Sequence, residues 1–198
     1  AGSVTKRDEK TAAAIFESLL LTGIAMSFTK TSRPGSGTEH IMAHFWECME
    51  LLDGKMPNYH GEDVGVTTLI MLRYYEALSR LPQVTAHPEV CNWDEIYRIY
   101  GPLAPDVQKL NTPDTITDGI TPRRIEACWP QIRRIVQSVP SYDACLAAMR
   151  QAGCKTTIEE VGKAPDFVDI SFRFHPYMRR RLSLKRVSHM LDLPEDLF

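Results

Sequence analysis

Three histidines lie close together in one short stretch of this 198-residue chain. His40 and His44 are four residues apart, and His60 follows twenty residues after His40. On a helix, a spacing of four places two side chains on the same face. Neutral imidazole nitrogens are good ligands for zinc, ferrous iron and nickel. The spacing therefore indicates a candidate divalent-metal site, although such histidine pairs are also common where no metal binds.

A site with two histidines is incomplete. Catalytic zinc normally has three protein ligands and an open position for water or substrate. If His40 and His60 are ligands, the third could be His44, Glu39 or Glu62, or a residue outside the chain. The two carboxylates could instead orient the imidazole rings. The residues alone leave these alternatives open.

The segment before the first histidine, residues 29–37, is rich in turn-forming residues. Gly35 and Gly37 let a ligand approach backbone amides closely. The segment leads into the next helix, whose N-terminus carries partial positive charge. Arg33 is a candidate phosphate partner there, and an ordinary surface ion pair is the alternative. A candidate anion site thus adjoins the candidate metal site.

Helices must position these side chains, because apolar residues recur mainly with helical spacing and alternating strand patterns are few. The stretch 101–118 has three prolines and is expected to be a connection. Pro130 is expected to kink or divide its helix. We predict an all-α fold, with residues 1–198 as a single helical domain that has no nucleotide-binding module of its own. The predicted helices begin near Thr5 to Asp8 and continue to about residue 28, and then cover 38–52, 59–81, 93–100, 121–138, 142–152, 156–162, 166–180 and 183–192.

Composition excludes some functional classes. A formal charge of −2 gives no field that would recruit nucleic acid or an anionic membrane. The basic cluster of Arg179, Arg180 and Arg181 with Lys185 and Arg186 is expected to be the solvated face of a terminal helix. The apolar run at 12–28 contains polar interruptions. We expect it to be too short and too polar to span a bilayer, and therefore to form a buried helix.

Cysteine usage and the first residues indicate a cytoplasmic location. The five cysteines are odd in number and widely spaced, which favours free, partly buried thiols in a reducing compartment. Charged residues crowd positions 6–10, where a signal peptide would need an apolar region. We therefore expect no secretion signal.

Two contiguous motif runs resemble a known family. The run TGIAMSFTKTSRPGSGTEHIMAHFWE, followed by YHGEDVGV, is similar to the sn-glycerol-1-phosphate dehydrogenases. They belong to the superfamily of iron-containing alcohol dehydrogenases and dehydroquinate synthases. The specific match covers about residues 20–66, and later helices fit in general character. The resemblance implies the C-terminal helical bundle of a two-domain enzyme, whose N-terminal NAD(P)-binding domain is absent from this chain.

The resemblance also implies roles for individual residues. By match to SGTEH and YHGE, His40 and His60 are metal ligands, and His44 is the catalytic histidine that contacts the substrate. Arg33 is compatible with a substrate phosphate. The family's third ligand is an aspartate well upstream of the SRPxSG motif, and Asp8 lies too close to His40 to be its counterpart.

The activity implied is the interconversion of dihydroxyacetone phosphate and sn-glycerol 1-phosphate, a step of phospholipid metabolism. It needs zinc, iron or nickel together with NAD or NADP. The cofactor would be bound mainly by the absent domain, so we expect the isolated chain to be inactive. A homo-oligomer through the helical domain is compatible with the sequence, which gives no number of copies.

Two departures from the family pattern keep alternatives open. Gly35 stands where the family motif has alanine, and Ile41 where a second histidine is frequent. The alternatives are a glycerol dehydrogenase-like or dehydroquinate synthase-like domain, and a non-catalytic helical interaction domain.

Overall fold

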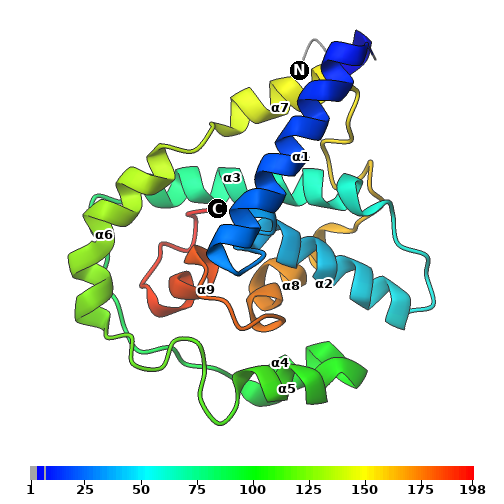
Figure 1. Ribbon diagram of the computed structural model, residues 1–198. Helices are drawn as coiled ribbons and strands as arrows, with labels where there is room; N and C mark the ends of the chain where they lie inside the picture. The colour runs from blue at the N-terminus through cyan, green and yellow to red at the C-terminus, as the bar shows by residue number, and fades with distance from the viewer. Residues whose placement is uncertain (1–3, 7) are drawn as a thin grey trace.

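The computed structural model describes residues 4–6 and 8–198, and helices dominate them (Figure 1). No strand is present in these residues, and Ala86 and Leu191 form an isolated antiparallel bridge. The all-α prediction is confirmed. The α-helices are α1 (Glu9–Thr29), α2 (Thr38–Leu52), α3 (His60–Arg80), α4 (Trp93–Tyr100), α5 (Ala104–Asn111), α6 (Pro122–Gln137), α7 (Tyr142–Ala152), α8 (Pro165–Phe174) and α9 (Leu184–Val187). The 3-10 turns are η1 (Val4–Lys6), η2 (Arg33–Gly35), η3 (Gly101–Leu103), η4 (His175–Tyr177) and η5 (Ser188–Met190).

The core is centred on α2, which packs against α3 and α8. Phe45 and Trp46 on α2 are fully buried. The indole nitrogen of Trp46 donates a hydrogen bond to the Ser171 hydroxyl of α8 at 2.7 Å, so this polar atom is satisfied inside the core. The C-terminal half of α3 adds Leu78, which is also fully buried. The helix pair that carries the three histidines therefore also contributes to the core.

Helix α6 crosses the C-terminal end of α3 (Figure 1). The indole nitrogen of Trp129 donates to the carbonyl of Leu81, and Arg133 donates to the carbonyl of Ser79, so α6 satisfies carbonyls at the end of α3. Pro130 does not divide α6, which runs without interruption from residue 122 to 137.

The burial predicted for the first long helix is wrong. Helix α1 spans 21 residues, and in the described part of the chain only Thr11 of this helix is buried. Large apolar side chains are exposed along it, including Phe16 at 63%, Leu19 at 65% and Phe28 at 84%. The helix was also predicted to be too short and too polar to span a bilayer. By length and composition alone it is long and apolar enough to do so. The core helices of soluble proteins pass the same test. Figure 1 shows α1 as a long rod between the segment before α2 and the neighbourhood of α7.

Four other boundaries differ from prediction. The connection expected at 101–118 contains η3 and α5, because Pro102 and Pro105 occupy first-turn positions, where proline is tolerated. The helix expected at 156–162 is a set of turns. The helix expected at 166–180 ends at Phe174, just before Pro176. The last predicted helix, 183–192, is the short α9 followed by η5.

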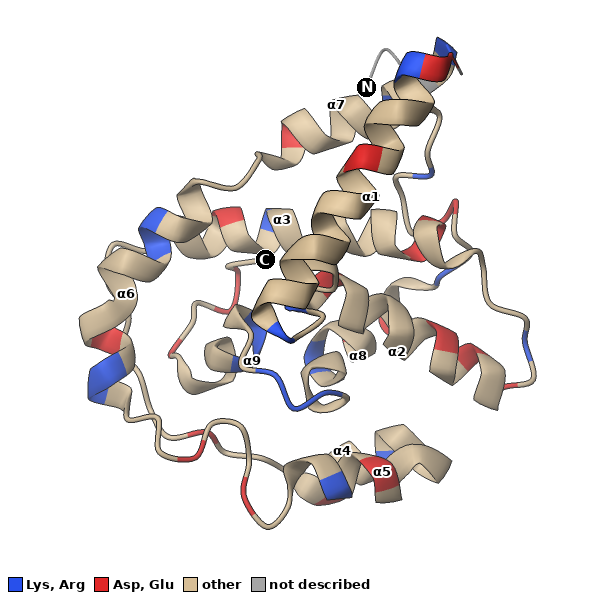
Figure 2. Cartoon of the chain, viewed as in Figure 1, with Lys and Arg blue, Asp and Glu red and all other residues tan. Residues whose placement is uncertain are grey.

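The basic cluster is not one solvated face. Figure 2 shows basic positions on the segment between α8 and α9, whereas Lys185 and Arg186 belong to α9 itself. Lys185 is 5% exposed, and Arg186 is fully buried. The Nε atom of Arg186 forms an ion pair with Oε1 of Glu89 at 2.6 Å. Arg181 is partly buried, and Arg180 is exposed. Tertiary packing therefore separates cationic side chains that are adjacent in sequence.

Candidate metal centre

The structure brings the three histidines together. His40 and His44 lie one turn apart on α2, and His60 is the first residue of α3. One nitrogen from each ring lies within 4.8 Å of the others. The Nε2 atoms of His40 and His60 are 3.0 Å apart. The side chains of His44 and His60 are 33% and 41% exposed, so the group is open to a ligand from solvent.

Two hydrogen bonds hold α3 against α2. The Thr67 hydroxyl contacts the carbonyl oxygen of Glu39 at 2.9 Å, and the Tyr75 hydroxyl donates to Thr38 at 3.0 Å. The connection 53–59 returns the chain so that the first turn of α3 lies against the middle of α2. The relative position of the histidines therefore depends on the packing of two helices.

Glu47 orients two of the histidines. Its carboxylate oxygens lie 2.8 Å from Nδ1 of His44 and 2.5 Å from Nδ1 of His60. A carboxylate that accepts Nδ1–H leaves the Nε2 lone pair free, which is the common arrangement behind a metal-bound histidine. The Nε2 lone pairs of His44 and His60 are then available to a shared ligand.

The protonation states suit metal binding. Burial lowers the pKa of His40, and the charges of His60 and His44 lower it further. Burial raises the pKa of Glu47, but the hydrogen bonds from His60 and His44 outweigh it and the net shift is downward. Neutral imidazoles beside an ionised carboxylate are the required forms for a divalent cation.

The donor set fits a small divalent ion. Nitrogens bound to zinc at about 2.0–2.1 Å in tetrahedral geometry lie about 3.3 Å apart. The 3.0 Å between the Nε2 atoms of His40 and His60 is close to this distance. The three ligand atoms together spread up to 4.8 Å, so the residue types and this one distance are compatible with zinc or ferrous iron.

The two carboxylates considered as third ligands are engaged elsewhere. Glu39 accepts a hydrogen bond from the amide of Gly37 at 3.0 Å. Its carboxylate lies so close to Gly37 that a side chain at this position would collide with it, since a Cβ there would be 2.4 Å from the nearer oxygen. Glu62 forms an ion pair with Lys155 at 2.8 Å. Among the alternatives named from sequence, these contacts leave His44 and a residue outside the chain.

A hollow of about 700 Å³ adjoins His60. It is lined by residues 56–60 together with Glu62 and Lys155. The hollow has room for a small polar molecule beside His60, and neither His40 nor His44 lines it.

Arg33 lies in η2, before α2, and is exposed. The amides of Gly35, Ser36 and Gly37 are used within the segment: they donate to Ser32, Arg33 and Glu39 respectively. These three amides are therefore not free to cradle an anion as the sequence suggested.

Arg181 was missed by sequence reasoning. Its guanidinium donates to the carbonyl of Ser36 and, at 2.6 Å, to the hydroxyl of Ser32. Burial lowers the pKa of Arg181, and the charges of Arg179 and Arg33 add to this effect. Arg33 therefore lies near Arg179 and Arg181 at the entry to α2, although it is distant from them in sequence.

Glu47 was also missed, although a signal for it exists. It lies three residues after His44 and seven after His40, so all three share one face of α2. The sequence offers no comparable signal for Arg181, because its partners lie about 145 residues earlier.

Comparison with known proteins gives matches to one kind of enzyme. The chain is 28% identical over 184 residues to the glycerol-1-phosphate dehydrogenase [NAD(P)+] of Geobacillus stearothermophilus. It is 26% identical over 188 residues to that of Geobacillus thermodenitrificans. A 69-residue match to the enzyme of Methanocorpusculum labreanum is 42% identical and covers 35% of this chain. No family model matches, and no solved structure does.

The two longer matches cover most of this chain but less than half of each relative. They include 93% and 95% of this chain but only 39% and 40% of the relatives' own length. The chain is therefore similar to glycerol-1-phosphate dehydrogenases over about two fifths of their length, consistent with their C-terminal domain.

Proposed function

We propose that residues 1–198 act as one helical domain that provides the metal and substrate site of an NAD(P)-linked glycerol-1-phosphate dehydrogenase. The observation that carries the proposal is the group of three histidines within 4.8 Å, in a chain related to such enzymes over 93% of its length. The proposed reaction interconverts dihydroxyacetone phosphate and sn-glycerol 1-phosphate.

His40 and His60 would hold the ion, zinc or else iron or nickel. When bound, a divalent ion supplies Lewis-acid polarisation of a carbonyl or stabilisation of an alkoxide. His44 would hold a substrate hydroxyl and relay its proton, since Glu47 fixes the ring through Nδ1. Arg33 would contribute positive charge for the substrate phosphate.

NAD or NADP would be bound mainly by the part of the relatives that this chain does not span. We therefore propose that the isolated chain binds metal but does not oxidise NAD(P)H with dihydroxyacetone phosphate. A homo-oligomer, a cytoplasmic location and a role in phospholipid metabolism are parts of the same proposal.

Metal binding tests the proposal directly. Isothermal titration of the chain with Zn²⁺ should give one site, and His40→Ala or His60→Ala should remove it. His87→Ala is the matched control, because His87 lies on a different segment and its side chain is 39% exposed. Equal zinc affinity in all four proteins would exclude the metal site and favour a non-catalytic helical domain.

Substrate choice is tested in the full-length enzyme. Activity on glycerol 1-phosphate well above that on glycerol is expected, and Arg33→Ala should raise KM for the phosphate ester only. The reverse preference would favour a glycerol dehydrogenase.

A further inference from the structure

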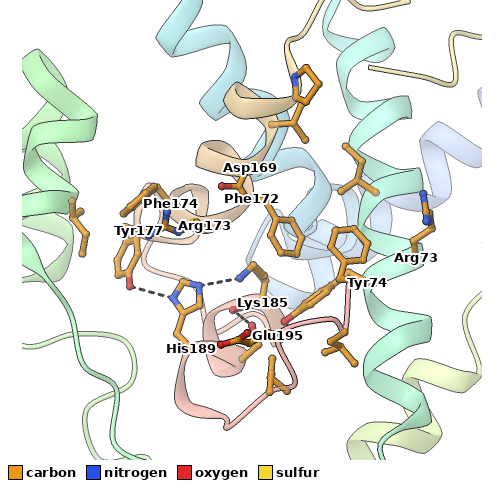
Figure 3. Close-up of a pocket in the computed structure, with 18 of the residues that line it drawn as sticks. Arg73, Tyr74, Asp169, Phe172, Arg173, Phe174, Tyr177, Lys185, His189 and Glu195 are labelled. Atoms are coloured by element: carbon orange, nitrogen blue, oxygen red, sulfur yellow. Dashed lines mark hydrogen bonds between the residues drawn. The ribbon is translucent and has the colours of Figure 1, made fainter. Parts of the chain in front are cut away.

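A larger cavity lies between α3, α8 and α9, apart from the three histidines (Figure 3). Its volume is about 780 Å³, within the range of small-molecule sites. Residues of α3, α8, α9, η5 and the C-terminal segment line it, and none of the candidate metal ligands does. The proposed dehydrogenase function does not use this cavity.

Aromatic rings form one wall of the cavity. The ring centroids of Tyr74 and Phe172 are 4.8 Å apart, and those of Phe172 and Phe198 are 5.0 Å apart. Tyr74 and Phe198 are 5.4 Å apart, so the three rings contact one another in pairs. Aromatic surfaces in this arrangement bind a flat, apolar ring well.

Lys185 points into the cavity from α9 (Figure 3). The residue is only 5% exposed, and its Nζ lies 4.5 Å from the centroid of Phe172 and 5.5 Å from that of Tyr74. Its hydrogen bond is to the Nε2 of His189 at 3.0 Å. No carboxylate of the described residues lies within 4.0 Å of this nitrogen, so the buried amine forms no ion pair.

These surroundings favour the neutral amine. Burial and, to a smaller extent, the charge of Arg173 lower the pKa of Lys185 to about 7, against the opposing effect of Asp169. The His189 ring also links Lys185 to Tyr177, whose hydroxyl lies 3.1 Å from Nδ1. If Nδ1–H donates to that hydroxyl, Nε2 accepts an N–H of Lys185, and the lone pair of the amine stays free to attack. A neutral lysine amine beside an imidazole is an activated nucleophile.

We propose that this cavity binds small aromatic aldehydes and that Lys185 captures them as an imine. The Nζ lone pair attacks the carbonyl carbon, and the carbonyl π electrons move to its oxygen. Transfer of a proton from nitrogen to that oxygen gives a carbinolamine. Loss of its hydroxyl with one more proton from nitrogen releases water and leaves a C=N bond. Amine and aldehyde become imine and water, and no oxidant or reductant is needed.

His189 is suited to move these protons, because its Nε2 adjoins the reacting nitrogen. The aromatic wall would hold the ring of the aldehyde while its carbonyl faces the amine. The proposal therefore assigns a positioning role to Phe172 and a proton-transfer role to His189.

Reductive trapping tests the proposal on the unmodified chain. The protein is incubated with 4-hydroxybenzaldehyde and sodium cyanoborohydride at pH 7.4, and modified lysines are located by peptide mass spectrometry. Lys185 should be labelled at least about ten-fold faster than Lys55 or Lys109, because exposed lysines are almost entirely ammonium at this pH. The side chains of those two lysines are 67% and 77% exposed. Labelling of Lys185 at an equal or slower rate would overturn the proposal.

Propanal in place of the aromatic aldehyde tests the role of the ring. The rate ratio of aromatic to aliphatic labelling should be several-fold higher at Lys185 than at Lys109. Phe172→Leu should lower that ratio at Lys185, and Lys185→Arg should abolish the fast adduct, because a guanidinium does not form the imine. If a variant does not fold, the wild-type rates at individual lysines decide the question alone. An identical ratio at both lysines would refute a site for aromatic ligands.

Discussion

Glu47 on α2 holds the ring of His60 on α3, with 2.5 Å between its Oε1 and the Nδ1 of the histidine. Its other oxygen holds His44 of its own helix at 2.8 Å. One carboxylate therefore fixes two rings that approach from different helices. This makes Glu47 the residue on which the geometry of the candidate metal centre depends.

Glu47→Gln should weaken zinc binding by about 10–100-fold, the usual effect of removing a carboxylate behind a metal-bound histidine. Isothermal titration with Zn²⁺ measures it. Asp53→Asn, just after the C-terminal end of the same helix and exposed, is the control and should leave the affinity unchanged. Wild-type affinity in Glu47→Gln would show that the rings are positioned without this carboxylate.

Arg181 and Arg180 anchor two different loops. Arg181 binds Ser32 and Ser36, whereas Arg180 binds Asp114 and the carbonyl of Leu110. Arg181→Ala should therefore speed amide hydrogen exchange in residues 32–37 by about ten-fold, the effect of losing roughly 1.4 kcal/mol of local stability. Arg180→Ala should instead act on 110–115. Exchange that rises in neither segment would contradict these anchoring roles.

The histidine group could be predicted from sequence because it depends on local spacing and on one short connection. His40, His44 and Glu47 share a helix face by periodicity alone. Arg181 could not be predicted, because its contact joins segments at opposite ends of the chain. The basic cluster shows the same limit. Residue type predicted a solvated face, but Arg186 is buried beside Glu89.

Helix predictions that relied on the positions of proline were wrong in two places. The prolines of 101–118 indicated a connection, although two of them begin short helices. Pro130 was expected to affect its helix, and α6 nevertheless runs through it. The burial of α1 failed for another reason. The apolar sequence of α1 indicates that its side chains favour burial. It does not indicate whether other segments of this chain bury them.

Lys163 joins α2 to α3 inside the protein. Its side chain is 2% exposed, and its Nζ lies 2.6 Å from Glu50 and 3.5 Å from Asp63. Lys163→Met should cost about 3–5 kcal/mol, because both carboxylates lose their buried partner. Urea denaturation measures the loss.

Lys155→Met is the matched control for that experiment. Its ion pair with Glu62 is about one third exposed on both sides, so its removal should cost at most about 1 kcal/mol. Similar losses in the two variants would show that burial does not determine the strength of these pairs.

His175 should make stability depend on pH. Burial lowers its pKa from 6.5 to about 3, and the ring is fully buried, with Nδ1 2.8 Å from the carbonyl of Ser171. Between these two pKa values the unfolded chain binds the proton and the folded chain does not. Stability is therefore complete above about pH 6.5 and falls as the pH drops towards 3, by about 1.4 kcal/mol per unit for one such group.

His175→Asn tests this dependence, because the amide can still donate to the same carbonyl and does not titrate. Denaturation between pH 7 and 4 should give a shallower decline for the variant. Burial also lowers the pKa of His189, so the difference between the two proteins, rather than the wild-type slope, is the measure. Parallel curves would exclude His175 as a source of acid sensitivity.

The exposed apolar side chains of α1 should affect the solubility of the chain without affecting metal binding. Phe16, Leu19 and Leu20 are exposed, and none of them belongs to the histidine group. Replacing them with glutamate or lysine should reduce self-association at high concentration while zinc affinity stays constant. Substitutions on α1 should therefore change the solubility of the chain, whereas substitutions on α2 and α3 should change its metal affinity.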